Sequence, residues 1–320
     1  MIEPLRWGIL STGGIARTFA RDLAFVEESV AVAVGSRTLE SAKRFADDFD
    51  IARRYGSYEE LVGDPDVEAV YVATPHPLHH DNAILALEHG KHVLVEKSFT
   101  MNAREAREVV DVARRQGLFA MEAMWTRFLP SVMAIRELVT RGELGTIVSV
   151  EADHGQWFSP DPNFRLFAPE LGGGALLDLG IYPVSFASMI LGTPSRILSM
   201  VDPAFTGVDG QTSMLFGYEN GAHAVLTCTS LARSPTRASI TGEKARIEIE
   251  GSFYAATGFD LINRSGATQR FDFPRLGRGL HYEVQEVARC VRSGLLESPF
   301  MPLAETISIM ETMDTVLATR

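Results

Sequence analysis

The residues best suited to chemistry lie at and just after a glycine-rich stretch in the middle of the chain. Gly172, Gly173 and Gly174 precede an apolar segment that is typical of the start of a helix. Asp178 and Tyr182 are four residues apart, so on a helix a carboxylate and a phenol would project from one face. Such a pair could position a substrate and exchange a proton with it. The alternative is a glycine turn into a helix whose Asp and Tyr are merely solvated.

A lysine that could assist the phenol follows the apolar segment 92–95. A lysine at the carboxyl end of a parallel strand points into the crevice where such sheets bind ligands. A free phenol titrates near pH 10, and a nearby cation favours the phenolate. We therefore expect Lys97 to meet Tyr182 at one site.

The first turn of the chain suits a phosphate. An apolar run over 7–10 ends in a glycine turn, and helical spacing follows from residue 16 to residue 25. A strand, a glycine turn and a helix together present backbone N–H groups to an anion. Measured against G-x-G-x-x-G, the three positions hold Ser11, Gly13 and Ala16, so the first glycine is missing. A tight turn without a ligand is the alternative.

The end of the next predicted strand, 30–34, bears on cofactor choice. An acidic residue near this point binds the ribose 2′-OH of NAD, whereas an arginine accommodates the 2′-phosphate of NADP. Here no acid is present, and Ser36 and Arg37 offer a hydroxyl and a guanidinium. This favours NADP(H) over NAD. The alternative is an exposed loop whose Thr38 caps the following helix.

Three histidines follow the apolar strand predicted over 67–74. His76, His79 and His80 could suggest a metal site, but no Cys or carboxylate cluster completes one in this stretch. A loop at the end of a parallel strand would lie beside a bound cofactor in any case. We therefore predict no metal.

The order of the predicted elements indicates two domains. Strands and helices alternate through residue 123, which predicts a Rossmann domain over 1–123 with a doubly wound parallel sheet. Residues 124–320 contain six segments of period-2 alternation with little helix between them. They predict an α+β domain with a large, mostly antiparallel sheet and flanking helices. A helix or a second subunit would have to cover its open face, and the C-terminal helix is expected to pack back toward the first domain.

Aromatic residues and arginines gather on both sides of the first strand of the second domain. Aromatic walls with a few arginines suit sugar or cyclic diol rings, whose C–H faces stack while their hydroxyls seek polar partners. A core between the domains is the alternative for part of this set. The set comprises Trp125, Arg127, His154, Trp157, Phe158, Phe164, Arg165 and Phe167.

Composition limits the function classes. The chain has 320 residues, 46% of them hydrophobic, with a formal net charge of -11. This charge argues against a nucleic-acid-binding surface. The two cysteines are too few for a disulfide framework, the N-terminus does not resemble a signal peptide, and no apolar run suggests a membrane span. We expect a soluble, cytoplasmic protein.

The ordered motifs resemble those of the Gfo/Idh/MocA oxidoreductase family over nearly the whole chain. The carriers are residues 8–13, Ala73-Thr74-Pro75-His76, Val95-Glu96-Lys97, and the triple glycine with 178–182. Residues 121–128 are similar to the branch of dimeric dihydrodiol dehydrogenases and NADP-dependent D-xylose dehydrogenases. Two departures are Ser11, in place of a glycine, and Ser98, in place of the proline that usually follows Lys97.

The resemblance implies an NADP-dependent oxidoreductase that acts on a sugar or cyclic diol and dimerises through its C-terminal sheet. It implies Tyr182 as general acid–base, Lys97 as its partner and Asp178 as a positioning group. The residues expected at the substrate are Trp125, His154, Phe158, Phe164 and Arg165. Those expected at the cofactor are Ser11, Thr12, Gly13, Gly14, Ile15, Ser36, Arg37, Thr74, Pro75, His76, His79, Glu96, Lys97, Trp125 and Arg127. A keto-sugar reductase of the anhydrofructose type and a non-catalytic NADP-binding regulator remain alternatives.

Overall fold

The computed structural model describes residues 3–319, which form two compact units. The first unit comprises the described residues up to Trp125 together with Leu276–Thr306. The second unit comprises Thr126–Arg275 and the chain from Ile307 onward. The sequence analysis placed the segment 276–306 in the second domain, whereas in the structure it packs with the first unit.

The first unit is built on a six-stranded parallel sheet with the strand order β3-β2-β1-β4-β5-β6. This order confirms the predicted doubly wound Rossmann sheet, and it brings the carboxyl ends of all its strands to one edge. Its strands β1, β4, β5 and β6 are largely apolar and almost wholly buried, as a sheet covered on both faces requires. The strands are β1 (Leu5–Leu10), β2 (Ser29–Gly35), β3 (Arg53–Tyr55), β4 (Ala69–Val72), β5 (His92–Glu96) and β6 (Ala120–Ala123).

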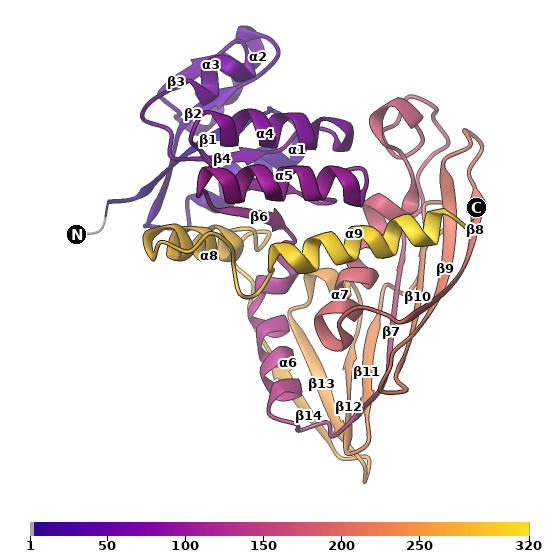
Figure 1. The fold of residues 1–320 in the computed structure, drawn as a ribbon. Coiled ribbons are helices and arrows are strands. Elements are labelled where there is room, and N and C mark those ends of the chain that lie inside the picture. The colour runs from indigo at the N-terminus through magenta and orange to yellow at the C-terminus, as the bar shows by residue number, and fades with distance from the viewer. Residues whose placement is uncertain (1–2, 320) are drawn as a thin grey trace. The chain divides into compact units, whose positions relative to one another are not determined.

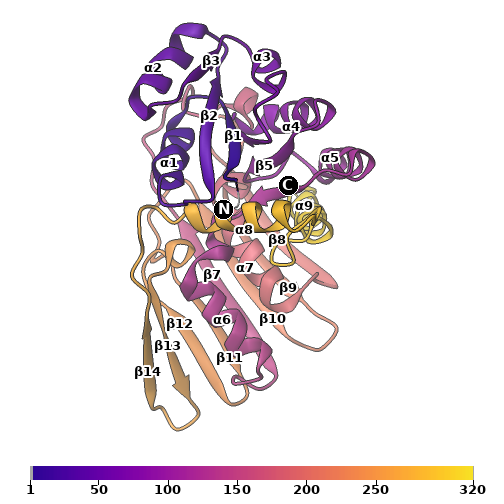
Figure 2. The ribbon, with the colours of Figure 1, turned by 90° about the vertical axis from the view of Figure 1, so that its left-hand side faces the viewer.

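Helices lie on both sides of this sheet (Figure 2). On one side are α1 (Gly14–Leu23), α2 (Leu39–Phe49) and α8 (His281–Arg292); on the other are α3 (Tyr58–Val62), α4 (His79–Glu88) and α5 (Ala103–Gln116). Side chains of Thr38, Ser57 and Asn102 cap the starts of α2, α3 and α5 by accepting backbone N–H groups. These local caps explain why the sequence pattern located those helices.

One buried carboxylate ties the segment 276–306 to the first unit. Asp22, on α1, accepts hydrogen bonds from the backbone N–H groups of Arg278, Gly279 and Leu280, at 3.0, 2.7 and 2.9 Å. Gly277 lies against the same carboxylate with φ at +55°, a conformation that favours glycine. The contact joins residues more than 250 positions apart, so no local pattern in the sequence could reveal it.

The second unit is built on an eight-stranded sheet with the order β14-β13-β12-β11-β7-β10-β9-β8. All neighbouring strands are antiparallel except β10 and β7, so the predicted mostly antiparallel sheet is confirmed. The strands are β7 (Ile147–Gly155), β8 (Arg196–Pro203), β9 (Asp209–Gly217), β10 (His223–Thr229), β11 (Ala238–Gly242), β12 (Ala245–Ile249), β13 (Gly258–Asn263) and β14 (Thr268–Asp272). The sequence analysis missed β13 and β14. Strand β14 is largely exposed and lacks apolar alternation.

Three helices accompany this sheet. They are α6 (Pro130–Thr140), α7 (Ile181–Leu191) and α9 (Leu303–Leu317), and the division between the two units falls within α9. Figure 1 shows α6 and α7 along one face of the sheet. The segment Pro169–Leu191 is long and apolar enough to cross a membrane, contrary to the expectation from sequence, but 78% of its most apolar window is buried in the protein. A core helix of a soluble protein has the same properties.

Candidate active site

The first turn of the chain is shaped to receive an anion. The N–H of Ser11 donates to the carbonyl of Gly35 at 2.9 Å, and the hydroxyls of Thr12 and Ser36 lie 3.4 Å apart. Ser11 occupies the position of the missing glycine with φ at 108°, a conformation that side chains rarely adopt. Helix α1 then starts at Gly14 with neither a side-chain cap nor an acid in its first turn. This arrangement fits a dinucleotide phosphate, with Ile15 exposed beside it.

Ser36 and Arg37 follow β2 at the same edge of the sheet. Ser36 is buried against Thr12, whereas Arg37 is exposed. Burial raises the pKa of Tyr58, and the positive charge of Arg37 opposes that rise. The guanidinium therefore lies near α3, at the end of β2, where a 2′-phosphate would be expected.

Two histidines hold the turn that carries Lys97. The Nε2–H of His76 donates to the carbonyl of Lys97 at 3.2 Å. Both ring nitrogens of His79 lie 2.8 Å from backbone carbonyl oxygens, those of Ser98 and Thr74. Burial lowers the pKa of His79. The Lys97–Ser98 peptide bond is cis. His79 is fully buried, so its direct effect is on the shape of this turn, and its predicted contact with a cofactor stays a prediction.

Buried carboxyl groups lie behind this turn. Glu96 accepts hydrogen bonds from the hydroxyl of Tyr71 and from the N–H of Lys97, and Glu122 accepts one from the N–H of Phe99 at 3.1 Å. Glu283, on α8, is 0% exposed and has no hydrogen-bond partner among residues 3–319. Burial raises the pKa of Glu283 well above its ordinary value, and neighbouring acids add to the rise. Burial without a hydrogen-bond partner in the described part of the chain therefore favours the protonated, uncharged form of Glu283.

Trp125 and Arg127 are two residues apart in the sequence but belong to different units. The guanidinium of Arg278 lies 5.1 Å from the centroid of the Trp125 ring, within the first unit. Arg127 is buried in the second unit, where its Nε and Nη2 donate to the hydroxyl and the carbonyl of Ser185, at 2.9 and 2.8 Å. Arg127 thus holds α7 three residues beyond Tyr182, and its predicted contact with a cofactor stays a prediction.

The predicted acid and phenol lie on one helix in the second unit. This helix begins at Ala175, contains a π-helical turn over Leu176–Gly180, and continues as α7. Such turns occur frequently at functional sites. Asp178 and Tyr182 are only 5% and 8% exposed. The guanidinium of Arg165 donates a hydrogen bond to each carboxylate oxygen of Asp178, both at 2.9 Å. The structure therefore brings these two predicted residues together.

Two rings pack against Tyr182. Its ring centroid lies 5.3 Å from that of His154 and 5.0 Å from that of Tyr254, and the last two rings stack at 4.5 Å. His154 Nδ1 lies 3.2 Å from the carbonyl of Leu179, which can only accept, so Nδ1 carries the proton. The side-chain amide of Gln156 donates to Nε2 at 2.9 Å. Sequence analysis missed Tyr254, because it stands in a single 3-10 turn, Phe253–Ala255, that carries no motif.

The predicted aromatic residues of the loop before the triple glycine pack on one another. Phe164 lies 5.3 Å from Phe158 and 6.3 Å from Phe167, and Phe205 adds a ring 5.0 Å from Phe167. Phe167 is buried in a small core, against which Phe158 and Phe164 pack. This cluster anchors the loop from which Arg165 reaches Asp178. Whether Phe158 and Phe164 also contact a substrate stays a prediction.

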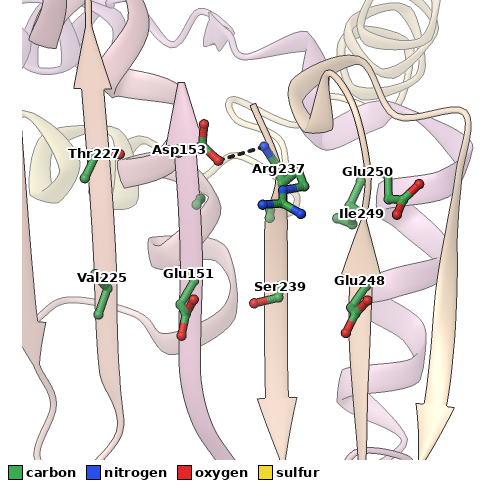
Figure 3. A pocket seen from close by; sticks show the side chains of 11 residues that line it. Glu151, Asp153, Val225, Thr227, Arg237, Ser239, Glu248, Ile249 and Glu250 are labelled. Carbon is green, nitrogen blue, oxygen red and sulfur yellow. Dashed lines mark hydrogen bonds between the residues drawn. The ribbon is translucent and has the colours of Figure 1, made fainter. Parts of the chain in front are cut away.

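A hollow of about 430 Å³ lies on the open face of the eight-stranded sheet, the face that α6 and α7 do not cover. Figure 3 shows the side chains that line it, among them Glu151, Val225 and Glu248, and the bond from the Arg237 backbone to Asp153. None of the predicted catalytic residues lines this hollow. Across residues 3–319, no three His, Cys, Asp or Glu side chains are grouped closely enough to hold a metal ion.

A Rossmann unit with an open helix N-terminus, followed by a sheet unit with a buried Asp–Tyr helix, is the arrangement expected of a dinucleotide-dependent oxidoreductase. The family description "Oxidoreductase family, NAD-binding Rossmann fold" matches residues 5–124, and "GFO/IDH/MocA C-terminal domain" matches residues 132–248. The chain belongs to the Gfo/Idh/MocA family of oxidoreductases, as its motifs predicted.

Named relatives extend over nearly the full length. Trans-1,2-dihydrobenzene-1,2-diol dehydrogenase of Mus musculus is 41% identical, over 97% of this chain and 95% of the relative. D-xylose 1-dehydrogenase (NADP(+)) of Hypocrea jecorina is 37% identical, over 98% of this chain and 91% of the relative. A 3-ketoreductase from Actinomadura kijaniata, solved in complex with NADP and TDP-benzene, superposes with a TM-score of 0.88 at 26% identity, over 99% and 98% of the two chains.

Proposed function

We propose that this protein is an NADP-dependent dehydrogenase that transfers a hydride between NADP(H) and a hydroxyl-bearing carbon of a sugar or cyclic diol. The names of the dihydrodiol and D-xylose dehydrogenases, 41% and 37% identical, support this substrate class. The observation that carries the proposal is the helix on which Tyr182 stands four residues after the buried, arginine-bound Asp178. A phenol and an oriented carboxylate on one helix are the groups that handling an alcohol requires.

The nucleotide end of the proposed site lies in the first unit. The open N-terminus of α1 would hold the cofactor pyrophosphate, and Ser36 with Arg37 would hold the 2′-phosphate of NADP. Thr74, Pro75 and His76 follow β4 at the same edge of the sheet and would flank the nicotinamide. When bound, the cofactor supplies or accepts the hydride, so the protein must provide orientation and a path for the proton.

The proton path is assigned to Tyr182. In the direction of oxidation its phenolate accepts the proton of the substrate hydroxyl, and in the direction of reduction its phenol returns that proton. Lys97 is proposed as the cation that favours the phenolate. Asp178, whose orientation Arg165 fixes, would accept a hydrogen bond from a second hydroxyl of the substrate.

Replacement of the phenol tests this assignment. We expect Tyr182→Phe to bind NADPH as the wild type does and to lose about 10²- to 10⁴-fold in kcat, the usual contribution of a positioned acid–base. The assays are fluorescence titration of NADPH and turnover with D-xylose and a trans-dihydrodiol. A variant with undiminished turnover would remove Tyr182 from the mechanism.

Reduction of a keto-sugar is a second candidate, which the TM-score of 0.88 to a 3-ketoreductase favours. Both reactions use the same proton path and differ in the fit of the substrate. A panel of aldoses, dihydrodiols and keto-sugars, each assayed in both directions, separates them. Binding of NADPH without turnover of any substrate would instead favour a regulator.

We also propose that the protein is a cytoplasmic homodimer that contacts neither nucleic acid nor membrane. The net charge of -11 supports the absence of nucleic-acid binding, and two buried, unpaired cysteines suit a reducing compartment. On the open sheet face, Leu198, Leu215 and Val225 lie side by side across β8, β9 and β10, with Met200 two residues beyond Leu198. This exposed apolar row is the surface that we assign to the partner subunit.

A further inference from the structure

The helix that carries Asp178 and Tyr182 starts without a cap of its own. Its first residue is Ala175, and the preceding position, where Ser, Thr, Asp or Asn usually accepts an N–H group of the first turn, is held by Gly174. Gly174 has no side chain with which to do so. The orphan N–H groups at this buried helix start need an acceptor from elsewhere in the chain.

Asp209, the first residue of β9, supplies that acceptor. Its Oδ2 accepts a hydrogen bond from the N–H of Leu176, the second helical residue, at 2.6 Å. The side chain is only 5% exposed, so water competes little for this bond. A carboxylate at a helix N-terminus also interacts favourably with the helix dipole. The cap thus comes from a residue 33 positions further along the chain.

The triple glycine is shaped around this carboxylate. Gly174 has φ at +137°, and a Cβ added there would lie 2.1 Å from Asp209 Oδ1. A Cβ added at Gly173 would lie 2.8 Å from the carbonyl of Leu166. Gly173 and Gly174 are therefore explained by the close approach of the backbone to the loop that bears Arg165 and to Asp209.

Asp209 is itself held rigidly. The turn before it is closed by a hydrogen bond of 2.7 Å from the N–H of Ala204 to the carbonyl of Val208. The next residue, Gly210, accepts a bond of 2.9 Å from the N–H of Ser230 and lies so close to Ala204 that a Cβ would be 2.9 Å from its nitrogen. A rigid cap can fix the rotation of the helix, and this rotation determines where Asp178 and Tyr182 point.

We propose that Asp209 is a positioning residue for the reaction, because it caps the catalytic helix from an adjacent strand and fixes the placement of Tyr182 and Asp178. The inference rests on the proposed function, since it concerns the helix to which proton transfer is assigned. Asp209 makes no step of the chemistry itself.

Two substitutions at Asp209 test the proposal. Asp209→Ala removes the acceptor, and we expect kcat to fall about 10- to 100-fold, the cost of a misplaced catalytic group, with NADPH affinity unchanged. Asp209→Asn keeps a side-chain oxygen that can cap the same N–H, and we expect kcat within about threefold of the wild type. Asp202→Ala, an exposed aspartate on β8, is the matched control and should have no effect.

Hydrogen exchange at the Leu176 amide provides a readout besides turnover. The Leu176 amide is expected to be protected from exchange in the wild type and in Asp209→Asn, and to lose this protection in Asp209→Ala. If Asp209→Ala does not fold, exchange at Leu176 and kcat in the wild type and in Asp209→Asn test the proposal. Wild-type kcat in a folded Asp209→Ala would overturn the proposal, and so would rapid exchange at Leu176 in an Asp209→Asn variant that keeps wild-type kcat. Undiminished turnover of Tyr182→Phe would instead refute the proposed function, so the two failures are distinguishable.

Discussion

Arg165 and Asp178 form a bidentate ion pair, in which Nη1 donates to Oδ1 and Nη2 donates to Oδ2, both at 2.9 Å. The Asp178 side chain is 7% exposed, whereas that of Arg165 is 55% exposed. The planar fork fixes both oxygens of the carboxylate, which a lysine could not do. Because Arg165 comes from an irregular loop and Asp178 from a π-helical turn, the pair also ties these two segments together.

Loss of this fork should impair use of the substrate more than binding of the cofactor. We expect Arg165→Met to lower kcat/KM for a diol or sugar about tenfold, a modest value because the exposed guanidinium is screened by water. Arg165→Lys should recover only part of the loss. Arg246→Met, which removes an exposed arginine paired with Glu248 on β12, serves as control. Equal kcat/KM in all four proteins would show that Asp178 needs no partner.

Lys97 and Tyr182 should act as one unit. We expect Lys97→Met and Tyr182→Phe each to lower kcat by about 10²- to 10⁴-fold, and the double variant to be little worse than the weaker single one. Non-additivity is expected because either loss disables the same proton transfer. Steady-state kinetics of the four proteins measure this. Fully additive losses would mean that the two residues contribute separately.

Arg37 should determine the preference for NADP. Arg37→Met removes the guanidinium that we assign to the 2′-phosphate, and we expect KM for NADP to rise about 10- to 100-fold, the value of one or two charge-assisted hydrogen bonds. KM for NAD should change little. Arg44→Met, on the exposed face of α2, is the control. A parallel rise in KM for both cofactors would contradict the assignment.

Glu283 should make stability depend on pH. Its pKa is raised well above the ordinary value by burial and by the charges of Glu96, Asp22 and Glu122. Its contribution to stability is therefore full below the unfolded pKa, near 4.5, and is lost as the pH rises toward the folded pKa. The free energy of unfolding of Glu283→Gln relative to the wild type should rise with pH, by at most about 1.4 kcal/mol per unit.

Urea unfolding at pH 5, 6, 7 and 8 measures this difference. For Glu88→Gln, on the exposed side of α4, the free energy of unfolding should change with pH as it does in the wild type. Parallel curves for Glu283→Gln as well would mean that Glu283 does not titrate differently on folding.

The apolar row on the open sheet face should hold the homodimer together. We expect the wild type to run at about twice the 35.1 kDa of one chain in light scattering. The double variant Leu198→Glu and Met200→Glu should run as a monomer, because a buried unpaired charge at an interface is strongly unfavourable. Leu39→Glu, at an exposed leucine on α2 in the first unit, is the control. A monomeric wild type would refute the proposed dimer.

Local sequence patterns determined a large part of this molecule. Strand and helix periods predicted the parallel sheet, which the structure confirms. The turn after β1 and the pair Ser36-Arg37 led to the proposed nucleotide end of the site, which stays a prediction. These features depend on residues within one or two turns of each other, so spacing alone encodes them. For the same reason, the four-residue interval between Asp178 and Tyr182 placed both side chains on one helix before the fold was known.

Only the tertiary structure decided which side chains hold these residues in place. Asp209 caps the helix of Asp178 and Tyr182, Tyr254 packs on Tyr182, and Arg278–Leu280 bind Asp22. Each of these contacts joins distant positions. Burial makes such contacts strong. Because burial arises from the packing of whole elements, no spacing of residues in the sequence reveals which distant side chains will meet. The proposed chemistry therefore rests on residues that the sequence already singled out, whereas the groups that position these residues emerged only from the fold.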